Sequence, residues 1–129
     1  KNGKGFYLYS GRKRGGPDPA VTRNLSTGPE GKKTFGHEEI ADRAVLLMVK
    51  EAAFCLEEKI IDRPDLLDAA LIFGIGFPPF RGGLLRYADT LGAKAITGKL
   101  EGFAAKYGER FTPPASLVEM AKMGKGFYA

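Results

Sequence analysis

The residues with the most distinctive chemistry lie at positions 74–83, which read Gly-Ile-Gly-Phe-Pro-Pro-Phe-Arg-Gly-Gly. The Gly74-x-Gly76 pair matches the start of a glycine-rich turn that binds dinucleotide phosphates. Such a turn needs a strand before it, a third glycine at a fixed place and a helix that opens at the glycines. Here a helical pattern precedes the glycines, and Pro78 and Pro79 occupy the place where the next helix would open. We therefore expect a tight interhelical turn and no cofactor bound by this chain.

The large side chains of this loop indicate a role in packing or in an interface. Phe77 and Phe80 are too apolar to lie in water without reason, so we expect both to pack against helices. We expect Gly74 and Gly76 to set the backbone shape at positive φ. Arg81 has two interpretations. It binds a phosphate of coenzyme A or an acidic partner, or it forms a salt bridge within the domain, which we favour.

Two acidic residues on the preceding helices are candidates for positioning the loop. Asp68 lies about one and a half helical turns before Gly74. We expect its carboxylate to accept hydrogen bonds from loop N–H groups, the alternative being a solvated aspartate. Glu51 lies near the edge of an apolar helical arc. It is either buried and paired with an arginine of the loop or, as is more usual, exposed at the boundary.

The classical catalytic residue types are scarce. His37 is the only histidine, and it stands beside two glutamates at a predicted helix start, where we expect it to be solvated and not catalytic. Cys55 is the only cysteine and lies in an apolar helical pattern, so we interpret it as a small core residue and not a nucleophile. One cysteine forms no internal disulfide, which favours a reducing compartment. One His and one Cys build no ordinary zinc site, so no metal is expected.

Helices must position these residues, because apolar side chains recur at helical spacing from residue 37 onward. In the first and longest helix we expect the core side chains to be Leu47, Met48, Ala52, Cys55 and Leu56. Residues 6–9 either pair as a strand or pack as an anchor, and no later segment alternates like a strand. The fold class is therefore all-α, with four to five helices. The predicted helices cover residues 37–61, 63–73, 83–91, 93–107 and 115–123.

Charge divides the chain into two parts. Residues 1–33 hold eight Lys/Arg and two Asp/Glu, whereas residues 34–129 hold twelve and thirteen. Residues 10–36 are rich in Gly, Pro, Ser, Thr and basic residues, which is typical of a linker. We therefore predict an extended arm at 1–35 and a helical domain at 36–129. The basic arm allows nucleic-acid binding as a weak third alternative, but no aromatic residues are interleaved with its charges, so we expect no nucleic-acid partner.

Two further expectations concern processing. No run of 18 apolar residues occurs, so we expect no transmembrane segment. The sequence contains no charged-then-apolar leader, so we expect no signal peptide. The first residue is Lys rather than Met, which favours a piece of a longer polypeptide. The sequence Gly-Lys-Gly-Phe-Tyr occurs at both 3–7 and 124–128, either as an internal repeat or as a coincidence of composition.

A longer set of residues carries a resemblance to a known family. Asp68 precedes the loop, Arg86-Tyr87-Ala88-Asp89 and Gly92 follow it, and Glu39-Ile40-Ala41-Asp42-Arg43 and Glu51-Ala52-Ala53-Phe54-Cys55-Leu56-Glu57-Glu58 lie upstream. Together they resemble the 3-hydroxyacyl-CoA dehydrogenase C-terminal domain family, especially the long form in the α subunit of the fatty acid β-oxidation multienzyme complex. The resemblance runs from about residue 35 to the end, and residues 1–9 resemble the preceding joint. One departure is Lys50, where the family usually has Asn.

The resemblance implies a compact bundle of the 6-phosphogluconate/3-hydroxyacyl-CoA dehydrogenase C-terminal type, preceded by an extended arm. The parent would oxidise 3-hydroxyacyl-CoA with NAD and usually also hydrate enoyl-CoA, with its catalytic His and Glu in a nucleotide-binding domain outside this chain. It implies that a Gly-Phe-Tyr element closes such a helical domain and that the long enzymes carry two of them in tandem. The implied site is a structural or interface loop made of Asp68, Gly74, Gly76, Phe77, Pro78, Pro79, Phe80, Arg81, Gly82, Gly83 and Asp89.

The preferred hypothesis is therefore a non-catalytic C-terminal helical domain of a fatty acid β-oxidation multienzyme, which supports the active-site cleft and the assembly. The implied partners are the upstream NAD-binding and first C-terminal domains, a thiolase subunit, and a second copy of the chain. The implied location is the bacterial cytoplasm or an organelle matrix. The alternative is a stand-alone interaction or dimerisation module that uses the aromatic loop. A Gly-x-Gly-x-x-Gly strand–helix unit upstream in the gene would decide between them.

Overall fold

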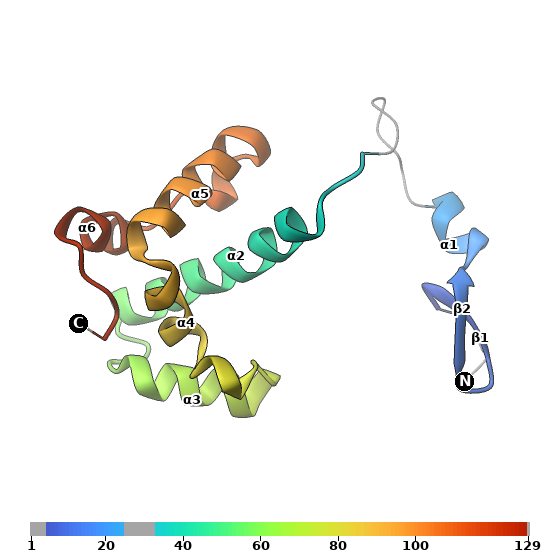
Figure 1. Ribbon diagram of the computed structural model, residues 1–129, viewed down its shortest axis with the longest axis horizontal. Coiled ribbons are helices and arrows are strands. Elements are labelled where there is room, and N and C mark those ends of the chain that lie inside the picture. The colour runs from blue at the N-terminus through green and yellow to red at the C-terminus, as the bar shows by residue number, and fades with distance from the viewer. Residues whose placement is uncertain (1–4, 25–32, 129) are drawn as a thin grey trace. The chain divides into compact units, whose positions relative to one another are not determined.

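The computed structural model describes residues 5–24 and 33–128. The chain divides into two compact units, Lys1–Phe35 and Gly36–Ala129. The second unit holds the apolar core, and we refer to it as the helical domain (Figure 1).

The first unit contains a hairpin of two antiparallel strands, β1 (Tyr7–Ser10) and β2 (Lys13–Pro17), followed by a short helix α1 (Pro19–Asn24). Gly11 supplies the positive φ of +59° that the tight turn between the strands requires. Of the two alternatives for residues 6–9, a strand or a packing anchor, the structure shows the strand, as β1. The prediction that no strand follows residue 9 was wrong, because β2 lies within the segment interpreted as a linker or extended arm. Sequence alternation missed β2 because Lys-Arg-Gly-Gly-Pro has no apolar face, and all its residues are exposed.

The helical domain confirms the all-α prediction. Its α-helices are α2 (His37–Glu57), α3 (Pro64–Ile75), α4 (Leu84–Leu91), α5 (Ala93–Tyr107) and α6 (Ala115–Met123). Two short 3-10 turns, η1 (Pro79–Arg81) and η2 (Glu109–Phe111), follow α3 and α5. No helix among residues 5–24 and 33–128 is long and apolar enough to cross a membrane.

Helix boundaries agree well with the predictions where glycine or proline marks them. Gly92, Gly108 and Gly124 all have positive φ and follow α4, α5 and α6. Other boundaries differ: α3 extends to Ile75 instead of residue 73, and α4 begins at Leu84 instead of residue 83. The first helix ends at Glu57 instead of residue 61, because the chain turns at Lys59 with a positive φ of 54°, which no glycine announces. The second helix starts at Pro64, with Arg63 and not Asp62 as its N-cap residue.

The short helix α4 lies at the centre of the packing, in contact with α2, α3 and α5, while α5 and α6 pack together (Figure 1). Leu84 and Leu85 are completely buried, as are Leu100 of α5 and Leu117 of α6. Burying each such side chain stabilises the fold by about 1.5–3 kcal/mol. Any change that displaces α4 therefore disturbs the core from several sides.

The core face of α2 is rotated from the predicted one. Leu46 and Val49 are buried at 1% and 0% exposure, and Ala52 is buried as expected. Leu47, Met48, Cys55 and Leu56 are instead partly buried and pack at the edge of the core. Many alanines on α2 widen its apolar arc, so the sequence did not fix which part of the arc faces inward.

The N-terminal half of α2 is joined to α5 by aromatic and charged side chains. Phe103, Tyr107 and Phe111 form a cluster with ring centroids 5.5–6.0 Å apart. The Tyr107 hydroxyl and the Lys106 ammonium donate to Glu39, and these bonds hold the pKa of that carboxyl below its usual range. These contacts fix the two helices without presenting a free reactive group.

Candidate functional site

Asp68 is the most completely enclosed acidic residue of the predicted site. Its side chain points from the second turn of α3 toward the start of α4 and is 3% exposed. Oδ1 accepts the N–H of Leu85 at 2.7 Å, and Oδ2 accepts the N–H of Arg86 at 3.1 Å. These are N–H groups of the first turn of α4, which have no partner within their own helix. Asp68 therefore caps α4 from a neighbouring helix, and its negative charge lies at the favourable end of the helix dipole.

Gly83 allows this contact. It is buried at the N-cap position of α4 with φ 118° and ψ 169°, a conformation that is essentially restricted to glycine. A Cβ atom at this position would overlap the Asp68 carboxyl group. The glycine is therefore required twice, for its backbone angles and for the space beside the carboxylate.

A second aspartate makes the same kind of contact at the other end of α4. Asp89 Oδ1 accepts the N–H of Phe127 at 2.8 Å, and Oδ2 accepts the N–H of Tyr128 at 3.0 Å. Gly126 leaves the necessary space, because a Cβ there would lie 2.6 Å from Asp89 Cγ. The carboxylate thus fixes the C-terminal segment by two consecutive backbone amides.

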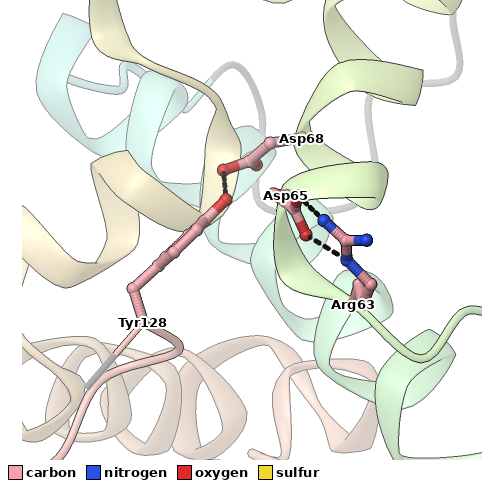
Figure 2. A network of polar contacts seen from close by, with 4 residues as sticks. All are labelled: Arg63, Asp65, Asp68 and Tyr128. Carbon is pink, nitrogen blue, oxygen red and sulfur yellow. Dashed lines mark hydrogen bonds and ion pairs between the residues drawn. The ribbon is translucent and has the colours of Figure 1, made fainter.

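Tyr128 connects the two aspartates. Its hydroxyl donates to Asp68 Oδ2 at 2.7 Å, as Figure 2 shows, and the Arg86 guanidinium lies 3.6 Å from the centre of its ring. Burial, reinforced by the bond to Asp68, raises the pKa of Tyr128 to about 12. We call Asp68, Arg86, Asp89 and Tyr128 the aspartate network. It joins α3, α4 and the C-terminal segment through satisfied donors and acceptors.

The pair Arg63 and Asp65 at the start of α3, also drawn in Figure 2, is separate from this network. Arg63 Nε donates to Asp65 Oδ1 at 3.0 Å, and a second bond joins Nη2 to Oδ2. The hydrogen bond from Arg63 lowers the pKa of Asp65. Because both side chains are about half exposed, this pair contributes little to stability.

The structure agrees with the sequence predictions for Phe77 and Gly76 of the loop but not for Phe80 and Gly74. Phe77 is buried at 9% exposure, but Phe80 is 82% exposed, so the expectation that it packs against helices was wrong. Gly76 ends α3 in the left-handed conformation with φ 74°. Gly74 is an ordinary residue of α3 without positive φ, so its predicted role in backbone shape was also wrong. A helical pattern that ends in several glycines does not show which glycine stops the helix.

The remaining loop residues form η1 and its exit. Pro78 and Pro79 begin the 3-10 turn, and Gly82 leaves it with φ 78°. Arg81 forms no ion pair with any residue that the structure describes, so the favoured salt bridge was wrong. Its guanidinium lies 4.9 Å from the ring centre of Tyr87 and 5.7 Å from that of Phe80. The loop thus presents an arginine and a phenylalanine to the outside.

The other candidate residues do not take part in the hydrogen bonds of the aspartate network. His37 is exposed at the first position of α2, and Glu51 is exposed on the same helix. Cys55 is half-buried at the edge of the core. Lys50 is buried, and its ammonium donates to the backbone oxygen of Arg110 at 2.7 Å. At this position the chain therefore has a cation that joins α2 to η2.

An apolar groove runs between α2 and α3. Its volume is about 330 Å³, and almost all of the surface that lines it is apolar. The lining residues are Leu47, Met48, Glu51, Ala52, Cys55, Leu67, Leu71 and Ile75. Ile75, one of the lining residues, is 64% exposed. Such a surface is typical of a site that another protein surface covers.

The comparisons with known proteins agree with this geometry. Residues 40–128 match the model of the 3-hydroxyacyl-CoA dehydrogenase, C-terminal domain. The chain belongs to this family. The resemblance inferred from the loop and its flanking helices is thereby confirmed. A curated relative, the fatty acid oxidation complex subunit alpha of Shewanella amazonensis, is 52% identical over 130 residues. The alignment covers 99% of this chain but 18% of that relative, so the chain spans less than a fifth of its length.

Sequence reasoning about this family member missed the C-terminal half of the site. Tyr128, Gly126 and Arg86 were not among the predicted site residues, although Asp68, Gly83 and Asp89 were. The available signal was the repeated Gly-Lys-Gly-Phe-Tyr sequence, which predicts that the pentapeptide has a defined structural role. It did not indicate that an aspartate 38 residues earlier binds its amides.

Proposed function

We propose that the chain is a non-catalytic C-terminal helical domain of a fatty acid β-oxidation multienzyme. The observation that carries this is the 52% identity, over nearly the whole chain, to part of a fatty acid oxidation complex alpha subunit. The whole polypeptide would oxidise 3-hydroxyacyl-CoA with NAD held by an upstream domain, and would usually carry an enoyl-CoA hydratase domain as well. This domain would support the active-site cleft and the assembly.

The side chains of the described residues favour a structural role for this domain over a catalytic one. A general base must reach the proton that it takes from a substrate, and Asp68 is only 3% exposed. Both oxygens of Asp68 and both oxygens of Asp89 already accept hydrogen bonds within the fold. His37 is exposed at a helix start. Among residues 5–24 and 33–128, no group of three His, Cys, Asp or Glu side chains is arranged to hold a metal ion.

The groove between α2 and α3 is the surface we assign to the neighbouring domains. It is apolar and open, and its lining residue Ile75 is 64% exposed. In a polypeptide with upstream NAD-binding and first C-terminal domains, covering these side chains would bury apolar area and hold the domain in place. A thiolase subunit would join the assembly through the whole polypeptide, and the location would be the cytoplasm of a bacterium or an organelle matrix.

The experiment compares two exposed apolar positions in the polypeptide that the complete gene encodes. Ile75→Asp places a charge in the groove, whereas Ile60→Asp places one at a 71% exposed residue outside its lining. We expect the parent protein to oxidise 3-hydroxyacyl-CoA with NAD. Ile75→Asp should lower its melting temperature or its activity, whereas Ile60→Asp should change neither. The proposal fails if the parent does not oxidise this substrate, or if both variants behave alike.

A second candidate function is a stand-alone module that dimerises through the same surface. The 64% exposure of Ile75 beside the apolar lining favours it, because two copies would cover these side chains. Light scattering of the 129-residue chain would show a dimer that Ile75→Asp dissociates. A gene without an upstream nucleotide-binding domain would favour this function over the first.

A further inference from the structure

Another pocket of the helical domain lies between the N-terminal half of α2 and the turn η2. Its volume is about 340 Å³, and it shares only Leu47 with the groove between α2 and α3. Its lining residues are Ile40, Arg43, Ala44, Leu47, Arg110 and Phe111. The lining therefore combines two arginines with four apolar side chains and contains no acidic residue.

Both arginines of this pocket lie over rings of one aromatic cluster. The guanidinium carbon of Arg43 is 4.1 Å from the ring centre of Tyr107, and that of Arg110 is 5.2 Å from the ring centre of Phe111. These two rings are neighbours, with their centroids 6.0 Å apart. Packing against a ring restricts a guanidinium, so two sets of N–H donors are held at the same pocket.

Lys50 brings a third positive charge to this side of α2. Arg43, Leu47 and Lys50 are spaced i, i+4 and i+7, which places them on one face of the helix. Lys50 is 9% exposed, and its ammonium donates to the backbone oxygen of Arg110 at 2.7 Å. No carboxylate among residues 5–24 and 33–128 pairs with it. A buried charge that lacks a counter-ion is costly, and this favours an anion nearby.

The acidic side chain that acts on these cations is already engaged. The charge of Glu39 interacts with Arg43, but its carboxylate accepts hydrogen bonds from the Lys106 ammonium and the Tyr107 hydroxyl. Arg110 forms no ion pair within the part of the chain that the structure describes. Positive charge is therefore in excess at this pocket, directly beside its apolar lining.

We propose that the pocket binds a small organic carboxylate with a short apolar chain. The carboxylate accepts hydrogen bonds from Arg43 and Arg110, because a guanidinium matches a carboxylate in bidentate geometry. The chain lies against Ile40 and Leu47. A volume of about 340 Å³ is at the low end for small-molecule sites, which favours a compact ligand over a peptide segment. The inference goes beyond the proposed function, because it requires neither an upstream domain nor dehydrogenase activity.

An NMR titration of the 129-residue chain with octanoate tests the inference, with the Nε–H signals of Arg43 and Arg110 as the readout. Acetate supplies the charge without the chain, and octanamide supplies the chain without the charge. We expect octanoate to shift both signals and to bind roughly tenfold or more tightly than either, because head and chain both contribute. Octanoate binding no tighter than acetate or octanamide, or unchanged arginine signals, would overturn the inference.

Two pairs of matched variants locate the ligand. Arg110→Gln should weaken octanoate binding by roughly tenfold, whereas Arg81→Gln, at another exposed arginine, should leave it unchanged. Ala44→Leu should also weaken it, because Ala44 lines the pocket, whereas Ala41→Leu changes an exposed residue of α2 outside the lining. Thermal unfolding verifies that each variant folds. Equal effects within either pair would overturn the inference.

The polypeptide that the complete gene encodes separates this inference from the proposed function. Octanoate binding that Arg110→Gln weakens there would support the pocket, whether or not the protein oxidises 3-hydroxyacyl-CoA. Loss of this binding in the complete polypeptide would overturn the inference, because a neighbouring domain would then cover the pocket. That result would leave the proposed function intact.

Discussion

Gly83→Ala tests whether the contact between Asp68 and the start of α4 holds the helical domain together. Two costs add at this position. An alanine in the φ 118°, ψ 169° conformation costs about 1–3 kcal/mol. Its Cβ would also overlap the Asp68 carboxyl group and push it away from the amides of Leu85 and Arg86. A hydrogen bond to a charged group contributes about 1.5–3 kcal/mol. We therefore expect a loss of about 3 kcal/mol or more.

The assay is chemical or thermal unfolding of the chain, with Gly74→Ala as a control. In a domain of this size, a loss of 1 kcal/mol lowers the melting temperature by about 4–8 °C, so Gly83→Ala should lower it by about 12 °C or more. Gly74 lies within α3, and a Cβ there meets no atom within 4 Å. Gly74→Ala should therefore stabilise the chain by about 0.5–1 kcal/mol, because alanine is the better helix former.

A double-mutant cycle identifies the cause of the loss. Asp68→Ala removes the carboxyl group that the new Cβ would displace, so Gly83→Ala should cost clearly less in the Asp68→Ala background than in the native one. The reasoning is refuted if Gly83→Ala costs less than about 1 kcal/mol, or if its cost is the same with and without the Asp68 carboxylate.

Three further predictions concern the core, the pH dependence and the activity. Leu46→Ala should destabilise by about 2–5 kcal/mol and Leu47→Ala by less, because Leu46 is 1% exposed and Leu47 lies at the edge of the core; equal losses in urea unfolding would contradict this. Because the pKa of Tyr128 is raised, its protonated hydroxyl contributes stability that is complete below pH 10 and is lost as the pH rises toward 12. Over that pH window, the free energy of unfolding should therefore fall less for Tyr128→Phe than for the native chain. The 129-residue chain should neither bind NADH in a calorimetric titration nor reduce acetoacetyl-CoA, and micromolar binding or turnover would place an active site on it.

The parts of the fold that sequence predicted best are those with local signals. Gly92, Gly108 and Gly124 mark the ends of three helices, and a helix end depends on a few neighbouring residues. The end of α2 at Glu57 was missed because Lys59 adopts a positive φ without being glycine. That conformation is imposed by the surrounding chain and leaves no mark in the local sequence.

The parts that sequence predicted poorly depend on contacts between distant residues. Phe77 and Phe80 are the same residue type three positions apart, yet one is buried and the other exposed, because η1 turns the chain between them. The face of α2 that points inward is decided by α4 and α6, which pack on it. A pattern within one helix gives the width of an apolar arc, but the neighbouring helices determine which residues on it are buried.

The aspartate network makes the C-terminal segment part of the core and not an appendage to it. Tyr128 bonds to Asp68 across 60 residues of sequence, and Phe127 bonds to Asp89 across 38. Because α4 lies between these contacts, its first turn is held by Asp68 and its last turn holds the C-terminal segment. Loss of the segment would leave Asp89 without its two amide donors and Asp68 without its hydroxyl donor, and the enclosed position of Asp68 makes that loss costly. Asp68 and Asp89 thus hold α4 at its first and last turns, which makes both of them structural residues of the helical domain.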